Sequence, residues 1–214
     1  MMVITIAGGY GCGGKHIAKL AAEKLGYRFC DDEIVSEAVK GNDLNMPEET
    51  FRYYDESTGT APLSEMTKLG AIQRGGYFSA IDSLIHDVLP LDRGMTELLR
   101  NVLTRLADEG NCVLLGRCAN HFLAGRKDVL SVYVMDEEDN CVSRIMESHP
   151  GLSEKEARKL IKKTNRRRAD YYSFFTGKRF GNMGDFAMVL NCAVLGVDGA
   201  AEILKSAAEA GLQG

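Results

Sequence analysis

Residues 3–16, VITIAGGYGCGGKH, decide the fold of this chain. The apolar run from Val3 to Ala7 is rich in β-branched residues and predicts a buried parallel strand. Five glycines follow within residues 8–14, and helical spacing of apolar residues begins directly after them. Glycines between a strand and a helix let successive backbone amides curve around phosphate oxygens, and the helix start adds partial positive charge. The stretch predicts a phosphate-binding loop, with a ligand-free tight turn as the alternative.

Two motifs fit this loop. Gly9 to Lys15 matches G-x-x-x-x-G-K, the loop that cradles a nucleoside triphosphate, although His16 stands where Ser or Thr is usual. Gly9, Gly11 and Gly14 also match G-x-G-x-x-G, with Asp31 some 17 residues later at a predicted strand end, as in dinucleotide-binding proteins. The loop alone therefore leaves open a phosphotransferase and a nicotinamide-dependent oxidoreductase. Lys15 favours the phosphotransferase, because a dinucleotide loop needs no cation at that point.

Outward from the loop, short apolar runs alternate with helical patterns. Further strands are predicted at residues 27–30, 111–115, 129–135 and 186–190, and a closing helix at 200–210. This alternation is typical of an α/β fold with a doubly wound parallel sheet, whose ligands bind at the carboxyl ends of the strands. Residues 33–110 look mainly helical, with breaks at 42–47, 59–62 and Pro90. The segment 41–110 is interpreted as a helical insertion that binds the acceptor.

Composition limits the classes of protein. With 214 residues, 45% of them apolar, the chain suits a single domain spanning 1–214. The formal charge of −4 argues against nucleic-acid or anionic-membrane binding, and no apolar run approaches the roughly 18 residues of a membrane helix. No signal peptide is evident at Met1–Ala7, so a cytoplasmic protein is expected. The six cysteines form no C-x-x-C pair and are interpreted mostly as small buried apolar residues of a reduced protein.

A basic helix is the second feature that favours phosphoryl transfer. Residues 153–156, SEKE, have the form of a capping box at its start. Two stripes with four-residue spacing follow on one face: Arg158, Lys162 and Arg166, and beside them Lys159, Lys163 and Arg167. Six like charges repel one another unless an anion is present. The region 151–185 is therefore predicted to be a phosphate-binding lid, with Arg168 just beyond the stripes, and the alternative is a solvated basic face.

Two residues at strand ends are candidates for the acceptor side. Asp31 follows the second strand and could orient the acceptor or hold a metal through water; its alternative role is a helix N-cap. Arg117 follows a buried strand, where a bidentate guanidinium suits a phosphate, and its alternative is a surface ion pair. His16 can hydrogen-bond a phosphate but is a poor magnesium ligand, since magnesium prefers oxygen. No side chain is assigned as a direct metal ligand.

Four stretches together resemble the cytidylate kinase-like family, a branch of the nucleoside monophosphate kinases. They are ITIAGGYGCGGKHIAKLAAEKLGYRFCDDEIV, VLLGRCANHFL, KLIKKTNRRRADYYSFFTGKRFG and FAMVLNCAVLGVDGAAEIL. The resemblance covers most of the chain and is weakest over residues 41–100. It implies a P-loop kinase-like three-layer fold with a five-stranded parallel sheet, an acceptor-binding insertion and a lid. It also implies ATP with Mg²⁺ as the donor and CMP or dCMP as the acceptor. Separately, a monomer or a homodimer is expected, the latter with helices of residues 64–110 paired between subunits.

The resulting site prediction has three parts. The nucleotide-binding loop is predicted to comprise Gly9, Gly11, Cys12, Gly13, Gly14, Lys15 and His16. The catalytic cations are predicted to be Lys15, Arg117, Arg166 and Arg168, and the acceptor-binding residues Asp31, Arg117, Lys162 and Asn165. Asn165 stands where the kinases carry an Asp that helps to read the acceptor base, and His16 where they carry a hydroxyl. These two departures motivate a second function, a nucleotide-binding regulator that has lost catalysis.

Overall fold

Strand β1 (Val3–Gly8) lies at the centre of a five-stranded sheet in this computed structural model, which describes residues 2–31, 34 and 82–211. The strand order is β2-β3-β1-β4-β5, and every pairing is parallel. The other strands are β2 (Arg28–Cys30), β3 (Cys112–Leu115), β4 (Val129–Met135) and β5 (Met188–Asn191). The predicted α/β class and five-stranded parallel sheet are confirmed, and the five strand predictions agree to within two residues at each end.

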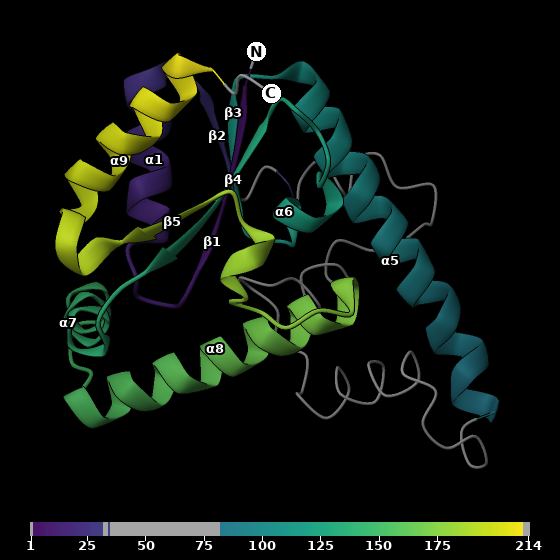
Figure 1. The fold of residues 1–214 in the computed structure, drawn as a ribbon. Helices are drawn as coiled ribbons and strands as arrows, with labels where there is room; N and C mark the ends of the chain where they lie inside the picture. Colours follow the sequence, from purple (N-terminus) through teal and green to yellow (C-terminus); the bar gives the residue numbers. More distant parts are fainter. Residues whose placement is uncertain (1, 32–33, 35–81, 212–214) are drawn as a thin grey trace.

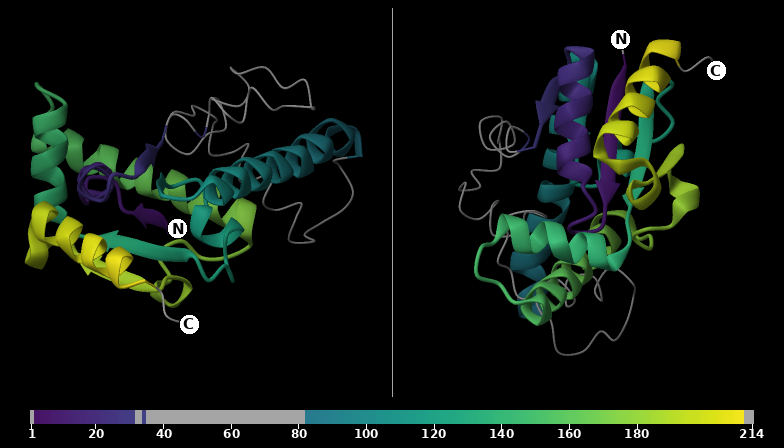
Figure 2. Two further views of the ribbon diagram at one scale, coloured as in Figure 1. Left: turned by 90° about the horizontal axis from the view of Figure 1, so that it is seen from above. Right: turned by 90° about the vertical axis from the view of Figure 1, so that its left-hand side faces the viewer.

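Helices cover both faces of the sheet (Figure 1). One face carries α1 (Gly14–Leu25) and α9 (Cys192–Ala210), and the other carries α5 (Asp82–Glu109) and the short α6 (Ala119–Phe122). Helices α7 (Glu138–Ser148) and α8 (Glu154–Thr176) contact and cross each other below the sheet (Figures 1 and 2), and a 3₁₀ turn spans Met183–Asp185. The layers explain why the strands read as continuous apolar runs, because neither face of a covered parallel sheet meets water.

Alternation along the central strand divides the interior into two cores. Val3 packs with α5, α6 and the aromatic end of α8, whereas Ile4 and Ile6 pack with α1, α7 and α9. In the neighbouring strand, Leu114 lies in the first core and Val113 in the second. This is the period of two expected of a strand buried on both faces.

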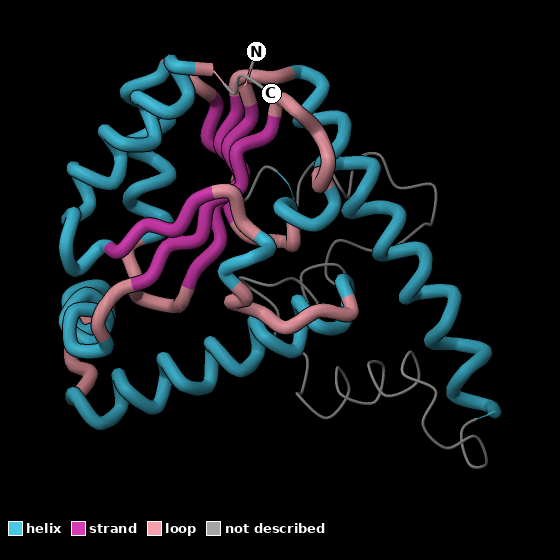
Figure 3. The backbone as a smooth tube through the Cα atoms, in the orientation of Figure 1, coloured by secondary structure: helices cyan, strands magenta, loops and turns pink. Residues whose placement is uncertain are grey.

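Helix α8 crosses below the carboxyl ends of the strands, the edge where parallel sheets bind ligands (Figure 3). Its start is fixed by the predicted capping box, in which Ser153 and Glu156 exchange hydrogen bonds. Ala157 and Ile161 near this start lie in the α1 core, while Tyr171 and Phe175 lie in the α5 core. The helix is therefore anchored in both layers, with its middle below the glycine loop.

Two expectations about helices were wrong. No break occurs at Pro90, because α5 continues through it from Asp82 to Glu109. A proline removes one backbone hydrogen bond, and a helix of 28 residues retains the others. The closing helix begins at Cys192 rather than at residue 200, because the Asn191 side chain caps it by accepting from the Ala193 amide, and Gly196 kinks it. The predicted breaks at 42–47 and 59–62 lie outside the described residues, as does the 41–81 part of the insertion.

Among the described residues, no helix combines the length and apolar character needed to cross a membrane.

Candidate functional site

The predicted glycine loop connects β1 to α1 and adopts a conformation that needs its glycines. Gly11 and Gly13 have φ angles of 85° and 86°, in the left-handed region that disfavours side chains. A Cβ atom at Gly9 would lie 2.8 Å from the Cys12 sulfur, and one at Gly11 would lie 2.9 Å from the Cys141 carbonyl oxygen. The loop backbone is thus packed closely against α7 at Gly11 and against the Cys12 side chain at Gly9.

The loop ends at an uncapped helix start. Gly13 is the N-cap of α1, and no side chain caps the helix there. The first amides of an α-helix have no partner within the helix, and its N-terminus carries partial positive charge. The N-terminus of α1 thus presents amide donors at the carboxyl edge of the sheet, where the sequence predicts an anion site.

Helix α7 holds the loop from one side through Arg144. Its guanidinium donates to the Gly11 carbonyl oxygen at 2.9 Å and pairs with the Asp136 carboxylate at 2.5 Å. The Asp136 side chain, directly after β4, is fully buried. Burial raises the pKa of Asp136, but hydrogen bonds from Asn140, Arg144 and the Glu137 amide outweigh this effect, so the pKa is lowered and the carboxylate stays charged. Arg144 is therefore a fixed link between β4, α7 and the loop.

Helix α8 holds the loop from the other side. The Asn165 side-chain oxygen accepts a hydrogen bond from the Tyr10 amide at 2.7 Å. Arg168 donates to the Gly8 carbonyl oxygen at 2.8 Å, and its guanidinium lies 5.6 Å from the centre of the Tyr10 ring. The basic helix and the glycine loop, 155 positions apart in sequence, are thus in direct contact.

A carboxylate at the end of β2 joins two predicted cations. Asp31 accepts from Lys15 at 2.6 Å through one oxygen and from Arg117 at 2.8 Å through the other. The Arg117 side chain is 1% exposed and that of Asp31 is 8% exposed, whereas that of Lys15 is 54% exposed. Arg117 therefore forms a buried ion pair with Asp31, rather than the surface ion pair that the sequence left as an alternative. These three residues follow β1, β2 and β3, so the sheet brings the predicted donor and acceptor sides together.

The pKa of Asp31 reflects these two partners. Burial alone would raise the pKa, but the hydrogen bonds and positive charges of Lys15 and Arg117 lower it below the usual value for aspartate. Asp31 is consequently a carboxylate at neutral pH.

The turn after β3 is strained where Arg117 lies. Gly116, Arg117 and Cys118 have φ angles of 71°, 52° and 57°, three successive left-handed residues of which two carry side chains. Such backbone costs on the order of 1 kcal/mol or more per residue, and it persists only where surrounding contacts enforce it. The buried guanidinium, which also donates to the Leu115 carbonyl oxygen at 3.2 Å, supplies such a contact.

The basic stripes on α8 are not a uniform field of unpaired cations. Arg158 pairs with Glu138 and Asp139 of α7 and with Glu154 one turn earlier on α8. The expectation that all six charges repel one another was therefore wrong for this residue, because three carboxylates surround it. The side chains of Lys162 and Arg166 are exposed, as is that of His16.

Sequence reasoning did not identify Arg144, Asp136 or Tyr10. Asp136 had a visible signal, an acidic residue directly after a buried strand. Arg144 had none, because nothing in a helical pattern shows that its side chain reaches a loop 133 positions earlier. Tyr10 occupies a variable position of the motif, so its role appears only with the contact to α8.

The chain is similar to known proteins in sequence and in fold. Residues 3–193 match the cytidylate kinase-like family. Among curated proteins, none matches the chain in sequence. A solved structure of an uncharacterized protein from Eubacterium ventriosum superimposes with a TM-score of 0.68 at 19% identity, covering 98% of this chain and 99% of the other. A shikimate kinase from Bacteroides thetaiotaomicron gives a TM-score of 0.49 at 17% identity, covering 96% of this chain and 97% of the other.

Proposed function

Because the chain belongs to the cytidylate kinase-like family of P-loop kinases, we propose that it transfers the γ-phosphoryl group of ATP to a nucleoside monophosphate, CMP or dCMP. The observation that carries the proposal is the Asp31 carboxylate, which joins Lys15 of the glycine loop to Arg117 at the end of β3. The Lys15 ammonium beside the loop is suited to the phosphates of ATP, and the Arg117 guanidinium at a neighbouring strand end to the phosphate of the acceptor. The two phosphate groups must come together for the transfer.

On the donor side, the amides of residues 9–15 bind the ATP phosphates and Lys15 supplies the positive charge. Its pair with Asp31 does not prevent this, because an ion pair with a half-exposed lysine contributes little free energy. The ammonium therefore exchanges Asp31 for the more highly charged polyphosphate. Arg168, bound to the Gly8 carbonyl oxygen, keeps a second positive charge beside the loop.

On the acceptor side, Arg117 and Asp31 orient the monophosphate, and Lys162 and Arg166 contribute positive charge. An oxygen of the acceptor phosphate forms a bond to the γ-phosphorus while the bond to the β–γ bridging oxygen breaks, and ADP leaves. Protein catalysis of such a step consists mainly of positioning and of neutralising the charge on the transferred group. The fixed cations at the carboxyl edge of the sheet meet both requirements.

Magnesium fits the site through a carboxylate rather than through the loop. His16 offers no oxygen, and no group of three or more potential metal ligands occurs among the residues that the structure describes. Asp31, once Lys15 turns to the phosphates, is the carboxylate that would hold Mg²⁺, directly or through water, together with the phosphate oxygens. When bound, Mg²⁺ neutralises charge on the phosphates. The residues thus permit magnesium without enclosing it.

A second candidate is a regulator that binds nucleotide without turning it over. It is favoured by the absence of a loop hydroxyl at His16 and by Asn165, whose oxygen is engaged by the Tyr10 amide. The family match favours a kinase loop over the nicotinamide-dependent oxidoreductase that the glycine spacing left open.

The experiment is a coupled assay with ATP, Mg²⁺ and a panel of ribo- and deoxyribonucleoside monophosphates. We expect turnover with CMP or dCMP, and a decrease of at least about tenfold in kcat/KM for Lys15→Ala, which corresponds to about 1.4 kcal/mol. Lys19→Ala removes the same charge from an exposed position on the same helix and should behave as wild type. Nucleotide binding without turnover on every acceptor would establish the regulator instead, and equal kinetics of both variants would remove Lys15 from the mechanism.

A further inference from the structure

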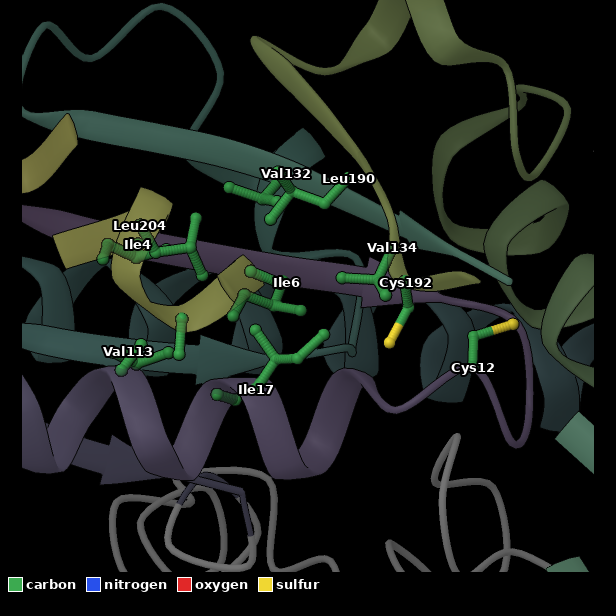
Figure 4. Close-up of a cluster of buried hydrophobic side chains, with 14 of the residues drawn as sticks. Ile4, Ile6, Cys12, Ile17, Val113, Val132, Val134, Leu190, Cys192 and Leu204 are labelled. Carbon is green, nitrogen blue, oxygen red and sulfur yellow. The ribbon is translucent and has the colours of Figure 1, made fainter. Parts of the chain in front are cut away.

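Three buried thiols cluster at the glycine loop. Cys12 belongs to the loop, Cys141 to α7 and Cys192 to the start of α9. Figure 4 shows Cys12 and Cys192 at the loop end of an otherwise aliphatic cluster. The sulfurs of Cys12 and Cys141 are 3.4 Å apart although 129 positions separate the residues, and both thiols are free.

The backbone on either side of this contact is already close. Gly11 packs directly against Cys141, since a Cβ atom at Gly11 would lie 2.9 Å from the Cys141 carbonyl oxygen and 3.0 Å from its Cβ. A disulfide has a sulfur–sulfur length of about 2.05 Å, so the two sulfurs need to approach by about 1.4 Å. Flexible glycines flank Cys12 on both sides, so the loop can supply this movement without breaking a helix.

We propose that Cys12 and Cys141 form a redox-sensitive modification site, which a peroxide oxidises to a disulfide that prevents the loop from binding polyphosphate. The second half of this proposal rests on the proposed function. Cys12 lies in the middle of the loop, and its amide donates to the Gly9 carbonyl oxygen at 3.2 Å. Drawing its sulfur toward α7 displaces the amides that would surround the phosphates.

The chemistry balances with hydrogen peroxide as the oxidant. The Cys12 thiolate attacks one peroxide oxygen, the O–O bond breaks, and the product is a sulfenic acid and, after protonation, water. The Cys141 sulfur then attacks the sulfenic sulfur, which releases a second water as the disulfide forms. Two thiols and one peroxide thus give one disulfide and two waters, and an external dithiol reverses the change.

The surroundings select Cys12 as the reacting thiol. The hydrogen bond between the Cys12 and Cys141 sulfurs lowers the pKa of Cys12 to about 7, assisted by the Asp136 backbone and the positive charge of Arg144, and opposed by burial and the Asp136 charge. The same hydrogen bond and burial raise the pKa of Cys141. Burial also raises the pKa of Cys192. Cys12 is therefore the readily deprotonated member of the cluster, and Cys141 the resolving thiol.

The chemical test is a peptide map of the full chain after treatment with hydrogen peroxide and blocking of the remaining thiols. We expect a linked Cys12–Cys141 peptide that dithiothreitol removes. In Cys141→Ser the link cannot form while a hydroxyl keeps a hydrogen-bonding group beside Cys12, and the sulfenic acid at Cys12 should be trapped by dimedone. Cys112→Ala, a buried cysteine at the opposite end of the sheet, should give the same linked peptide as wild type. Absence of the linked peptide in wild-type protein would overturn the thiol pair.

The functional test compares ATP binding by reduced, oxidised and re-reduced wild-type protein in a calorimeter. We expect affinity to decrease at least tenfold on oxidation and to return on reduction. Unchanged affinity in protein shown to carry the disulfide would overturn the switch. If the reduced protein binds no nucleotide, the proposed function fails and the switch with it, while the peptide map still decides whether the thiol pair exists.

Discussion

Asn165 in the middle of α8 accepts a hydrogen bond from the backbone amide of Tyr10 in the glycine loop, at 2.7 Å. The residue that family resemblance predicts to read the acceptor base is therefore bound to the glycine loop, which is proposed to hold the donor. These two roles make different kinetic predictions, because one concerns the donor nucleotide and the other the acceptor.

For Asn165→Ala we expect the KM or Kd for ATP to rise about fivefold while the KM for the acceptor stays within twofold, since a hydrogen bond of this kind contributes about 1 kcal/mol. Steady-state kinetics with each substrate varied in turn measure both values. Lys155→Ala, an exposed position near the start of the same helix and outside the basic stripes, is the control. A change confined to the acceptor KM, or to the preference among bases, would show that Asn165 reads the base instead.

Arg117→Ala should lower the free energy of unfolding by about 3–5 kcal/mol, because it leaves the Asp31 carboxylate buried and, among the described residues, ion-paired only with the half-exposed Lys15. Urea denaturation at neutral pH measures the change. Arg126→Ala removes a guanidinium that pairs with Asp108 and Asp128 near the surface, and should cost about 1 kcal/mol or less. Similar losses in both variants would contradict the assignment of Arg117 to a buried pair.

Asp31 should contribute to the pH dependence of stability. Its pKa is lower in the folded chain than in the unfolded chain, where the pKa of aspartate is about 3.9. The unfolded state therefore binds the proton more readily, so the contribution of Asp31 is fully present above the unfolded pKa and is lost as the pH falls through the folded pKa.

The measurement for Asp31 is urea denaturation of wild type and Asp31→Asn from pH 7 to pH 2. The difference in unfolding free energy between the two should be constant at neutral pH and should decrease on the acid side of about pH 4. Glu147→Gln, an exposed carboxyl on α7, controls for the general effect of a lost negative charge. A difference that grows as the pH falls would mean that the folded state does not favour the ionised form.

Arg144→Ala should weaken ATP binding without removing any group expected to touch the nucleotide. The substitution frees the Gly11 carbonyl oxygen and leaves the fully buried Asp136 carboxylate without its guanidinium. We expect a loss of about 3 kcal/mol in unfolding stability and at least a tenfold weaker Kd for ATP in the fraction that remains folded. Calorimetric titration provides the Kd, and Arg158→Ala, in the surface charge cluster between α7 and α8, should leave it unchanged.

Most of the fold could be predicted because it depends on local patterns. Val3 to Ala7 had to be a buried strand, and the capping box at Ser153 marked a helix start that the structure confirms. The helix break predicted at Pro90 was wrong. A proline is a local signal, whereas the other backbone hydrogen bonds of the 28-residue helix α5 keep it continuous.

Two signals in the sequence located parts of the site: residues that follow strand ends, and the basic helix, whose Asn165 and Arg168 meet the glycine loop. Lys15, Asp31 and Arg117 each follow a strand, and a parallel sheet gathers such residues at one edge. Arg144, Tyr10 and the contact between Cys12 and Cys141 depend on helices crossing far from their neighbours in sequence. The pairing of Arg158 with Glu138 and Asp139 was hidden for the same reason, although its partner Glu154 stands at helical spacing.

Helix α8 places side chains in both cores and meets the glycine loop between them. Loss of packing on either face of the sheet would release the same helix, and with it the support of the loop. Nucleotide binding at the loop should therefore stabilise the whole domain. When nucleotide binds, amide hydrogen exchange should slow at the loop and also in the aromatic end of α8 around Tyr171. Heat inactivation would then coincide with the unfolding transition of the domain instead of preceding it.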